Sequence, residues 1–440
     1  MEIAIISGEP SGDALGAELV CELKRQRPDC TFWGLGSGAM RSQGVRLLAD
    51  SASWGAIGVI EALTKVPVIL TRIAPMIKRE LAARRPDLLV LVDFGAFNVP
   101  LGRFARSLKL KTFYFVPPGS WRRIGRGAET LVEACDAVAT PFAWSAEYLS
   151  SAGLPTIWCG HPVLDRCRPS LTRAAFCEQF GLRPGAPIIA LLPGSRTAEA
   201  SALMPVLVDA ASEITAKESD AQFVVAVAPS ISREMMVSLL GRHPDLGSRF
   251  NGLWRRASDA IGQTLLRPVD RTVPVPAAAL PDGSSAPFPP EPDRKRASVR
   301  REAPPAFVLV SGMAIDVMAH ANVVIACSGT ATLEAAVLGV PTVIVYKGSQ
   351  LQYIEYKLRG IQRKVPFIGI PNILAEHQIM PELLQNDATP SAVAAAALEL
   401  MNDVGSRAVA KGEMEKIKAL LGSHGAAARA AEFALSIMKS

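Results

Sequence analysis

Leu88-Leu89-Val90-Leu91-Val92-Asp93-Phe94-Gly95 is an uninterrupted apolar run that ends in a carboxylate and a glycine. A run without polar alternation is typical of a strand in a parallel sheet whose two faces are both covered by helices. The arrangement returns in the second half of the chain, where residues 188–192 are apolar and Pro193-Gly194-Ser195-Arg196 follows. The two runs predict a parallel sheet in each half.

Short apolar runs alternate with amphipathic stretches long enough to be crossover helices throughout the chain. In the first half we predict strands at residues 3–6, 31–35, 88–92, 112–116, 137–140 and 156–159, and helices at 14–26, 68–83 and 142–152. After a polar break at 165–173, strands are predicted at 188–192, 222–228, 307–310, 323–326 and 342–346. The pattern predicts an α/β fold of two Rossmann-like domains facing across a cleft, with the chemistry in loops that follow strands.

The composition excludes several classes of protein. The chain has 440 residues, 49% hydrophobic and 20% charged, which is enough apolar material for a core and excludes overall disorder. The net charge of +6 suits anionic ligands or an anionic membrane surface. Seven cysteines without a C-x-x-C pair indicate neither a zinc ribbon nor a disulfide framework.

The N-terminal residues and the hydropathy predict an intracellular protein. Met1 leads directly into an apolar strand without a signal-peptide pattern, and no stretch approaches the ~20 apolar residues that span a bilayer. Ten prolines and the basic cluster Arg294-Lys295-Arg296 lie between residues 267 and 305. This composition predicts a solvated insertion, with a docking segment for an anionic partner as the alternative.

Two loops of the first half place polar residues directly after a predicted strand. Ser7-Gly8-Glu9-Pro10-Ser11-Gly12-Asp13 has glycines that let the backbone approach a ligand, and Ser11 or Asp13 is suited to cap the following helix. A tight turn without a ligand explains the same residues. Asp93 is either a general base for a hydroxyl nucleophile or a cap of the next helix.

Two loops of the second half are suited to bind a diphosphate. Gly194-Ser195-Arg196 puts a guanidinium at a helix start, where bidentate hydrogen bonds and the helix dipole favour phosphate. Ser328-Gly329-Thr330-Ala331-Thr332-Leu333-Glu334 offers N–H groups and hydroxyls, with Glu334 placed to accept from ribose hydroxyls. Together they indicate a nucleotide diphosphate; a surface Arg and a capped helix with a solvated Glu are the alternatives.

Two further features have open interpretations. His161, in Gly160-His161-Pro162, is either a packed hinge residue or a hydrogen-bond donor in the cleft. Residues 54–85 interleave apolar and basic side chains, which fits either an interfacial membrane segment or a core-facing helix with a solvated basic face. No H-E-x-x-H, Walker or Asp-x-Asp motif is present, so we expect no metal. We also expect no cofactor and no nucleic-acid partner.

Taken together, these motifs resemble the lipid-A-disaccharide synthase family. The resemblance rests on Ser7–Asp13 with Leu15-Gly16-Ala17, Ile57-Gly58-Val59-Ile60-Glu61, Asp93 with Phe97-Asn98, Gly160-His161-Pro162 with Asp165, Leu192-Pro193-Gly194-Ser195-Arg196, residues 328–334 and Ile370-Pro371-Asn372-Ile373-Leu374. The motifs follow the family's order and spacing across nearly the whole chain. The resemblance implies an inverting, metal-independent GT-B glycosyltransferase that joins UDP-2,3-diacylglucosamine to 2,3-diacylglucosamine 1-phosphate and releases UDP.

The resemblance also assigns roles to residues. It makes Asp93 and Arg196 catalytic and places Gly194, Ser195, Arg196, Ser328, Gly329, Thr330, Glu334 and Asn372 at the UDP-sugar. It places Ser7, Glu9, Ser11, Asp13, Asn98 and His161 at the acceptor or in the cleft. Membrane contact, within residues 54–79, is assigned to Ile57, Val59, Ile60, Leu63, Val66, Val68, Ile69, Arg72, Lys78 and Arg79.

The implied organisation is an acceptor domain at residues 1–165, a UDP-sugar domain at 166–424 and a C-terminal helix at 425–440 that packs back on the first domain. We expect a peripheral protein on the cytoplasmic face of the inner membrane, and a homodimer is compatible with the sequence.

The chain departs from the family pattern near the predicted acceptor site. Pro117-Pro118-Gly119-Ser120-Trp121-Arg122-Arg123 replaces a Ser-Pro-Ser-x-Trp-Ala-Trp run, Ala96 replaces an aspartate, and the Pro-rich insertion is foreign to the pattern. The altered run motivates one alternative, a UDP-sugar transferase with another acceptor. A second alternative is a catalytically silent lipid- or nucleotide-binding relative. Retention of Asp93, Arg196 and Glu334 argues against the silent relative.

Overall fold

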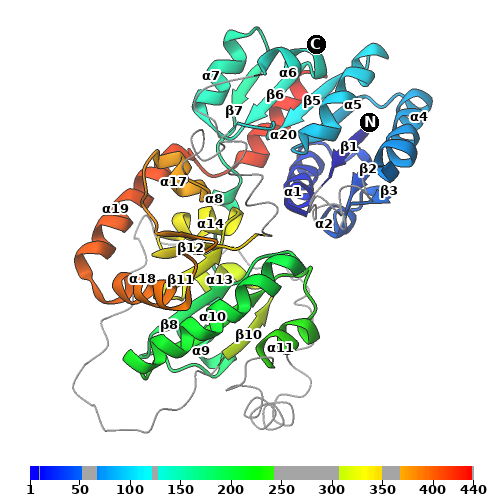
Figure 1. Ribbon diagram of the computed structural model, residues 1–440. Helices are drawn as coiled ribbons and strands as arrows, with labels where there is room; N and C mark the ends of the chain where they lie inside the picture. The colour runs from blue at the N-terminus through cyan, green and yellow to red at the C-terminus, as the bar shows by residue number, and fades with distance from the viewer. Residues whose placement is uncertain (9, 52–66, 121–126, 242–306, 349–366, 439–440) are drawn as a thin grey trace. The chain divides into compact units, whose positions relative to one another are not determined.

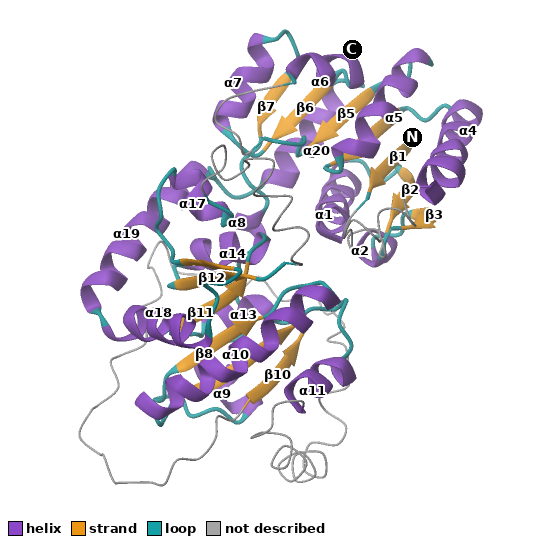
Figure 2. Ribbon diagram, in the orientation of Figure 1, coloured by secondary structure: helices purple, strands orange, loops and turns teal. Residues whose placement is uncertain are grey.

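The computed structural model describes residues 1–8, 10–51, 67–120, 127–241, 307–348 and 367–438. They form two compact units, Met1–Arg166 with Lys418–Ser440, and Cys167–Ile417. Each unit is a parallel sheet with helices on both faces (Figures 1 and 2). The predicted α/β class with two Rossmann-like domains is therefore confirmed.

The first unit is built on strands that pair in parallel in the order β3-β2-β1-β4-β5-β6-β7. Alternate residues of β1 pack on opposite faces, Ile3 and Ile5 on one and Ala4 and Ile6 on the other, so both faces are buried. The strands are β1 (Glu2–Ser7), β2 (Thr31–Gly36), β3 (Arg46–Asp50), β4 (Leu88–Val92), β5 (Thr112–Phe115), β6 (Ala137–Thr140) and β7 (Thr156–Trp158).

Helices from both ends of the chain cover this sheet. On one face α1 lies against the C-terminal helix α20, while α4, α5, α6 and α7 contribute to the core of the other face. The helices are α1 (Pro10–Gln26), α2 (Gly38–Ser42), η1 (Ile69–Ile73), α4 (Ala74–Arg84), α5 (Gly95–Ser107), α6 (Ala128–Ala134), α7 (Ala143–Ser151), α8 (Val163–Arg166) and α20 (Ala426–Ser436).

Asp165 anchors the start of α20. Its carboxylate accepts hydrogen bonds from the backbone N–H groups of Gly425, at 2.8 Å, and Ala426, at 3.0 Å. A carboxylate at a helix N-terminus satisfies N–H groups that otherwise lack partners. The C-terminal segment of the first unit begins at Lys418, before the boundary predicted at residue 425.

The second unit repeats the architecture with strand order β10-β9-β8-β11-β12-β13, all parallel. Its strands are β8 (Ile188–Leu192), β9 (Gln222–Val227), β10 (Phe307–Ser311), β11 (Val323–Cys327), β12 (Thr342–Tyr346) and β13 (Glu382–Leu384). Its helices are α9 (Arg173–Phe180), α10 (Thr197–Lys217), α11 (Arg233–Gly241), α13 (Ala314–Ala319), α14 (Thr330–Leu338), α17 (Ile370–Ala375), α18 (Pro390–Asn402) and most of α19 (Val404–Leu420).

Each sheet has one point where the order of strands along the chain reverses. In the first unit the reversal lies between β1 and β4, and in the second between β8 and β11. Open α/β sheets bind ligands beyond the carboxyl ends of the strands at such a switch point. The four loops singled out from the sequence follow these four strands.

The structure corrects several element predictions. Helix α1 begins at Pro10 rather than residue 14, because proline suits the first turn of a helix. Residues 68–83 do not form one α-helix, since the π-helical turn η1 precedes α4. Strands β3 and β13 were not predicted; each is short and lies at a sheet edge. The proposed insertion at 267–305 lies outside the described residues.

Candidate functional site

The two polar loops of the first unit meet at its switch point. Ser7 pairs in register with Val92, the residue before Asp93. A Cβ atom placed on Gly12 would lie 2.6 Å from the Ser7 hydroxyl oxygen and 3.8 Å from the Asp93 Cβ. A Cβ on Gly8 would lie 2.0 Å from the Phe94 ring, so only glycine fits there. The loop after β1 therefore packs directly against the turn that carries Asp93.

Asp93 occupies an unusual backbone turn. Asp93 and Phe94 have positive φ angles of 47° and 45°, a left-handed conformation that non-glycine residues adopt at an energetic cost. Two side chains hold the Asp93 carbonyl oxygen: the Tyr114 hydroxyl donates to it at 2.6 Å and the Asn98 amide at 2.9 Å. The Asp93 N–H donates to the Phe115 carbonyl at 3.1 Å.

Backbone strain continues in the neighbouring loop. Val116, which follows β5, has a φ of 55°, and a β-branched residue in that region is a genuine outlier. The loop then folds over the Asp93 turn, because a Cβ on Gly95 would lie 2.6 Å from the Pro118 side chain. Strained residues concentrate at functional sites. Pro118 of the altered run therefore adjoins the Asp93 turn, and residues 121–123 of that run lie outside the described part of the chain.

The environment of Asp93 suits a base. Burial raises the pKa of its carboxyl above the usual range, and a hydrogen bond from the Phe94 backbone N–H opposes the increase. Phe94, not Asp93, is the N-cap of α5, and it provides no side-chain capping bond. Asp93 therefore does not occupy the N-cap position of α5, and its role as a base stays a prediction.

Other residues assigned to the acceptor have structural tasks. Both carboxylate oxygens of Asp13 accept backbone hydrogen bonds at the start of α2, from Ser37 at 2.6 Å and Ala39 at 2.8 Å. Asp13 is buried, so it holds the loop after β2 rather than capping its own helix. Ser7 is buried, Ser11 is half-buried, and Glu9 lies outside the described residues.

Asn98 and His161 are also held within the protein. Asn98 is 0% exposed and its amide nitrogen donates to the carbonyl groups of Val92 and Asp93, so it supports the turn. His161 Nδ1 accepts from the Val163 N–H at 3.1 Å, and its ring lies against Phe142. Burial lowers the pKa of His161 to about 3, so this imidazole is neutral and fixes the segment before α8.

The Arg196 turn of the second unit is a self-contained capping box. The Glu199 carboxylate accepts from the backbone N–H groups of Ser195 and Arg196 at 3.2 Å and pairs with the Arg196 guanidinium at 2.9 Å. Gly194 has a φ of 114°, and a Cβ there would lie 2.7 Å from Glu199. The backbone N–H groups of Ser195 and Arg196 are therefore occupied, and the Arg196 guanidinium is half-exposed beside them.

The loop after β11 lies next to this turn. The Cβ position of Gly194 is 3.4 Å from the Cys327 sulfur, directly before Ser328. Gly329 and Thr330 are exposed at the N-terminus of α14, whose N-cap provides no side-chain hydrogen bond. The Ser328 hydroxyl donates to the Ile368 carbonyl at 2.9 Å, and Glu334 is half-buried one turn further on. The predicted pair of donor loops is thus brought together at one switch point.

Asn372 does not lie open to a nucleotide. It is 0% exposed, and its amide nitrogen donates to the Met380 carbonyl and the Glu382 carboxylate, each at 2.8 Å. Its amide oxygen accepts from the N–H groups of Ile379 and Met380. All its hydrogen-bonding capacity is used. The side chain of Asn372 is thus engaged within the protein, and Glu382, to which it donates, holds residues 368 and 369 beside Ser328. The predicted contact with the nucleotide stays a prediction.

The predicted membrane segment is only partly described. Ile57, Val59, Ile60, Leu63 and Val66 lie outside the described residues. Ile69 is buried in the core and cannot contact a membrane, and the Lys78 ammonium lies over the Phe104 ring. Val68 and Leu70 are 47% and 61% exposed, and Arg72 and Arg79 are exposed. No described helix combines the length and apolar character that crossing a bilayer requires.

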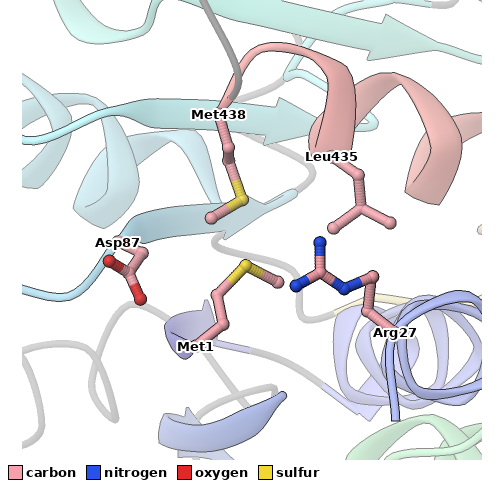
Figure 3. A pocket seen from close by; sticks show the side chains of 5 residues that line it. All are labelled: Met1, Arg27, Asp87, Leu435 and Met438. Carbon is pink, nitrogen blue, oxygen red and sulfur yellow. The ribbon is translucent and has the colours of Figure 1, made fainter. Parts of the chain in front are cut away.

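A small pocket of about 340 Å³ lies where the strands of the first sheet begin, at the end away from the Asp93 turn (Figure 3). Met1 and Asp87, which line it, precede β1 and β4, and Arg27, Leu435 and Met438 complete the wall. Arg27 is paired with the Asp29 carboxylate at 3.0 Å. Because it is at the amino ends of the strands, this pocket is separate from the candidate site.

Sequence reasoning missed three residues that shape the sites: Tyr114, Glu199 and Glu382. Glu199 had a detectable signal, since a Glu three residues after a helix cap completes a capping box. Tyr114 bonds across to the turn after the neighbouring strand β4, and Glu382 bonds from β13 to α17 and the residues before it, so no local pattern indicates either contact. In the part of the chain that is described, no three His, Cys, Asp or Glu side chains are grouped as metal ligands would be.

Comparison with solved structures supports the fold. A UDP-GlcNAc 2-epimerase from Neisseria meningitidis, solved with UDP-GlcNAc, has a TM-score of 0.51 at 10% identity and covers 100% of both chains. The calicheamicin glycosyltransferase has a TM-score of 0.51 at 13% identity, over 100% of this chain and 98% of the other. This similarity places the chain in the GT-B fold of glycosyltransferases and epimerases.

Comparison of sequences shows the family. The family model for lipid-A-disaccharide synthetase matches residues 3–245 and 291–437. Lipid-A-disaccharide synthases from Geobacter sulfurreducens and Myxococcus xanthus are each 31% identical, over 99% of this chain and 97% of the relative. The chain therefore belongs to the lipid-A-disaccharide synthetase family, whose members are glycosyltransferases of lipid A biosynthesis.

Proposed function

We propose that this chain transfers the sugar of UDP-2,3-diacylglucosamine to the 6-hydroxyl of 2,3-diacylglucosamine 1-phosphate. The products are UDP and a β-1,6-linked disaccharide 1-phosphate. The observation that carries the proposal is the position of Asp93: a carboxylate with a raised pKa, on a strained turn at a sheet switch point, in a chain of this family.

Asp93 acts as the general base. Its carboxylate takes the proton of the acceptor 6-hydroxyl while that oxygen forms a bond to the anomeric carbon of the donor. The bond from the anomeric carbon to the UDP oxygen breaks on the opposite face, and its electron pair leaves with the diphosphate. Because attack and departure occur on opposite faces, the anomeric configuration inverts. The raised pKa makes Asp93 a stronger base than an ordinary carboxylate.

Arg196 and the α14 N-terminus stabilise the leaving diphosphate. The guanidinium is half-exposed beside the loop after β11, and the first turn of α14 presents backbone N–H groups with a positive dipole end. Fixed positive groups where charge develops perform the electrostatic task that a divalent metal performs elsewhere. We therefore propose that turnover requires no added metal ion or cofactor.

We propose that the protein acts at the inner face of the inner membrane. Both substrates carry acyl chains, and the described start of the segment exposes Val68 and Leu70 beside Arg72. Exposed apolar side chains next to basic ones favour peripheral contact with an anionic lipid surface. Flotation with anionic vesicles tests this contact; unchanged binding by a Leu70→Ser/Arg72→Ser variant would count against it.

A different acceptor is the second candidate, because Pro118 of the altered run packs over Gly95 beside Asp93. One experiment separates the two. Purified protein in detergent is incubated with both diacyl substrates and EDTA. The masses of the products are measured by mass spectrometry, and the new linkage is assigned by NMR. The proposal predicts a tetra-acyl, β-linked disaccharide 1-phosphate. UDP release without that disaccharide would support the other acceptor, and a requirement for metal would refute the metal-independent mechanism.

A further inference from the structure

Strand β5 holds both backbone polar groups of Asp93. The Tyr114 hydroxyl donates to the Asp93 carbonyl at 2.6 Å, and the next residue, Phe115, accepts from the Asp93 N–H at 3.1 Å. We propose that Tyr114 is a positioning residue, whose hydroxyl fixes the left-handed turn that aims the Asp93 carboxylate. The inference rests on the proposed role of Asp93 as general base.

The identity of residue 114 is informative. Its neighbours on the strand are Phe113 and Phe115, all three are 0% exposed, and apolar packing alone would be satisfied by a third phenylalanine. A buried hydroxyl is unfavourable unless it forms a hydrogen bond, and here that bond reaches the backbone of Asp93. Burial, with the nearby Asp93 charge, raises the pKa of Tyr114 well above its usual range, so the hydroxyl remains a donor.

Tyr114 and Asn98 act on the same oxygen. A carbonyl oxygen has two lone pairs, and the Asn98 amide supplies the second donor at 2.9 Å. The two donors stabilise the left-handed conformations of Asp93 and Phe94, which persist only where their surroundings hold them. Asn98 also bonds to Val92 and so supports the strand end as well as the turn. Tyr114 is therefore the cleaner target for a test of positioning.

Loss of the hydroxyl should affect the chemical step and not substrate binding. Tyr114→Phe keeps the ring and its packing, and the Asp93 carbonyl oxygen loses one of its two side-chain hydrogen-bond donors. A carboxylate that samples other orientations meets the acceptor hydroxyl less often, so kcat should fall about tenfold, as expected from one hydrogen bond. KM for both substrates should stay within about twofold. Because the freed carboxylate is better hydrated, the acidic limb of the pH profile should move to lower pH.

Tyr148→Phe is the matched control. The Tyr148 hydroxyl also bonds to a backbone group of the first unit, accepting from the Ala128 N–H at 3.3 Å, at a place distant in sequence from the Asp93 turn. It should keep wild-type kcat and the wild-type pH profile. Equal losses in the two variants would mean that a general loosening of the unit is responsible, and would overturn the positioning role.

A double variant separates this inference from the proposed function. If Tyr114 acts through Asp93, Asp93→Asn with Tyr114→Phe should be no slower than Asp93→Asn alone. Wild-type kcat in Tyr114→Phe while Asp93→Asn is inactive would overturn the positioning role and leave the base intact. Full turnover by Asp93→Asn would refute the base, and the positioning role with it.

A readout without turnover tests the same contact. The Asp93 carboxyl can be titrated by NMR in protein labelled with carboxyl-13C aspartate, with its signal assigned by its loss in Asp93→Asn. The hydroxyl anchor predicts a lower pKa of Asp93 in Tyr114→Phe than in the wild type and no change in Tyr148→Phe. An unchanged titration in Tyr114→Phe would overturn the inference.

Discussion

Replacement of Asn372 by alanine tests whether this residue supports the donor loop or binds the nucleotide. The side chain makes four hydrogen bonds of 2.8–2.9 Å, two of them donated and two accepted, and none of its surface is exposed. Asn372→Ala leaves buried N–H groups at Ile379 and Met380 and removes a donor from the Glu382 carboxylate. Each buried group left without a partner costs about 1–3 kcal/mol, and neighbouring losses are not additive.

We therefore expect Asn372→Ala to reduce the free energy of unfolding of the second unit by about 3–5 kcal/mol. For a unit of this size that corresponds to a fall in Tm of roughly 6–20 °C. The assay is thermal unfolding followed by circular dichroism, with UDP affinity measured by calorimetry at a temperature where the variant is folded. The control is Asn402→Ala, which removes one exposed hydrogen bond to Glu218 in the same unit and should leave Tm nearly unchanged.

A direct role in binding predicts the reverse pattern. If Asn372 contacts the nucleotide, Asn372→Ala would unfold at the wild-type temperature and lose UDP affinity. That result would refute the buried network that the structure shows. A large fall in Tm, partly restored by saturating UDP through mass action, agrees with a supporting role.

Three other predictions address separate parts of the molecule. Gly8→Ala places a methyl group 2.0 Å from the Phe94 ring, so we expect slower turnover and, in thermal melts, a loss of about 1–3 kcal/mol of stability. Gly38→Ala, whose Cβ meets open space, should unfold like the wild type in the same melts. Arg196→Ala should weaken UDP binding at least about tenfold in calorimetry, since it removes a charged contact to phosphate, and Arg183→Ala, which breaks an exposed pair with Asp220, should not. Burial raises the pKa of Glu18 to about 7 from 4.5, so the folded state binds this proton more tightly and the contribution of Glu18 to stability falls as pH rises from 4.5 to 7. In thermal melts across that range, the Tm of Glu18→Gln should exceed that of the wild type by a margin that grows with pH. A margin that does not change with pH would contradict the raised pKa.

The fold could be predicted because buried parallel strands leave a simple trace in the sequence. Leu88–Val92 and Ile188–Leu192 are apolar throughout, and the structure places every residue of both in the core. The edge strands β3 and β13 were not predicted, because charged residues interrupt the apolar pattern: β3 begins with Arg46 and ends with Asp50, and β13 begins with Glu382. Their strand conformation depends on a neighbour that local sequence does not reveal.

The candidate site was predicted at the level of loops and less well at the level of side chains. Each of the four loops was predicted to follow a strand, and the structure places them after β1, β4, β8 and β11. The loops after β8 and β11, predicted to act together, lie side by side. The pattern could not show which polar groups are already occupied. Asp13, Asn98 and Asn372 have the residue types of ligand contacts, yet each is buried and bonds to the protein itself. Asp13 accepts from Ser37 and Ala39, Asn98 donates to Val92 and Asp93, and Asn372 bonds to Met380 and Glu382. Occupancy of this kind is a property of the tertiary structure.

The central claim is that Asp93 is the base of a sugar transfer, and Asp93→Asn tests it most directly. The amide keeps the size of the side chain and removes the proton acceptor. Disaccharide formation and binding of the UDP-sugar are measured on the same preparation. We expect kcat to fall by about 10²–10⁴, as is typical for loss of a general base, while donor affinity stays within about twofold. Wild-type turnover by Asp93→Asn would contradict the account.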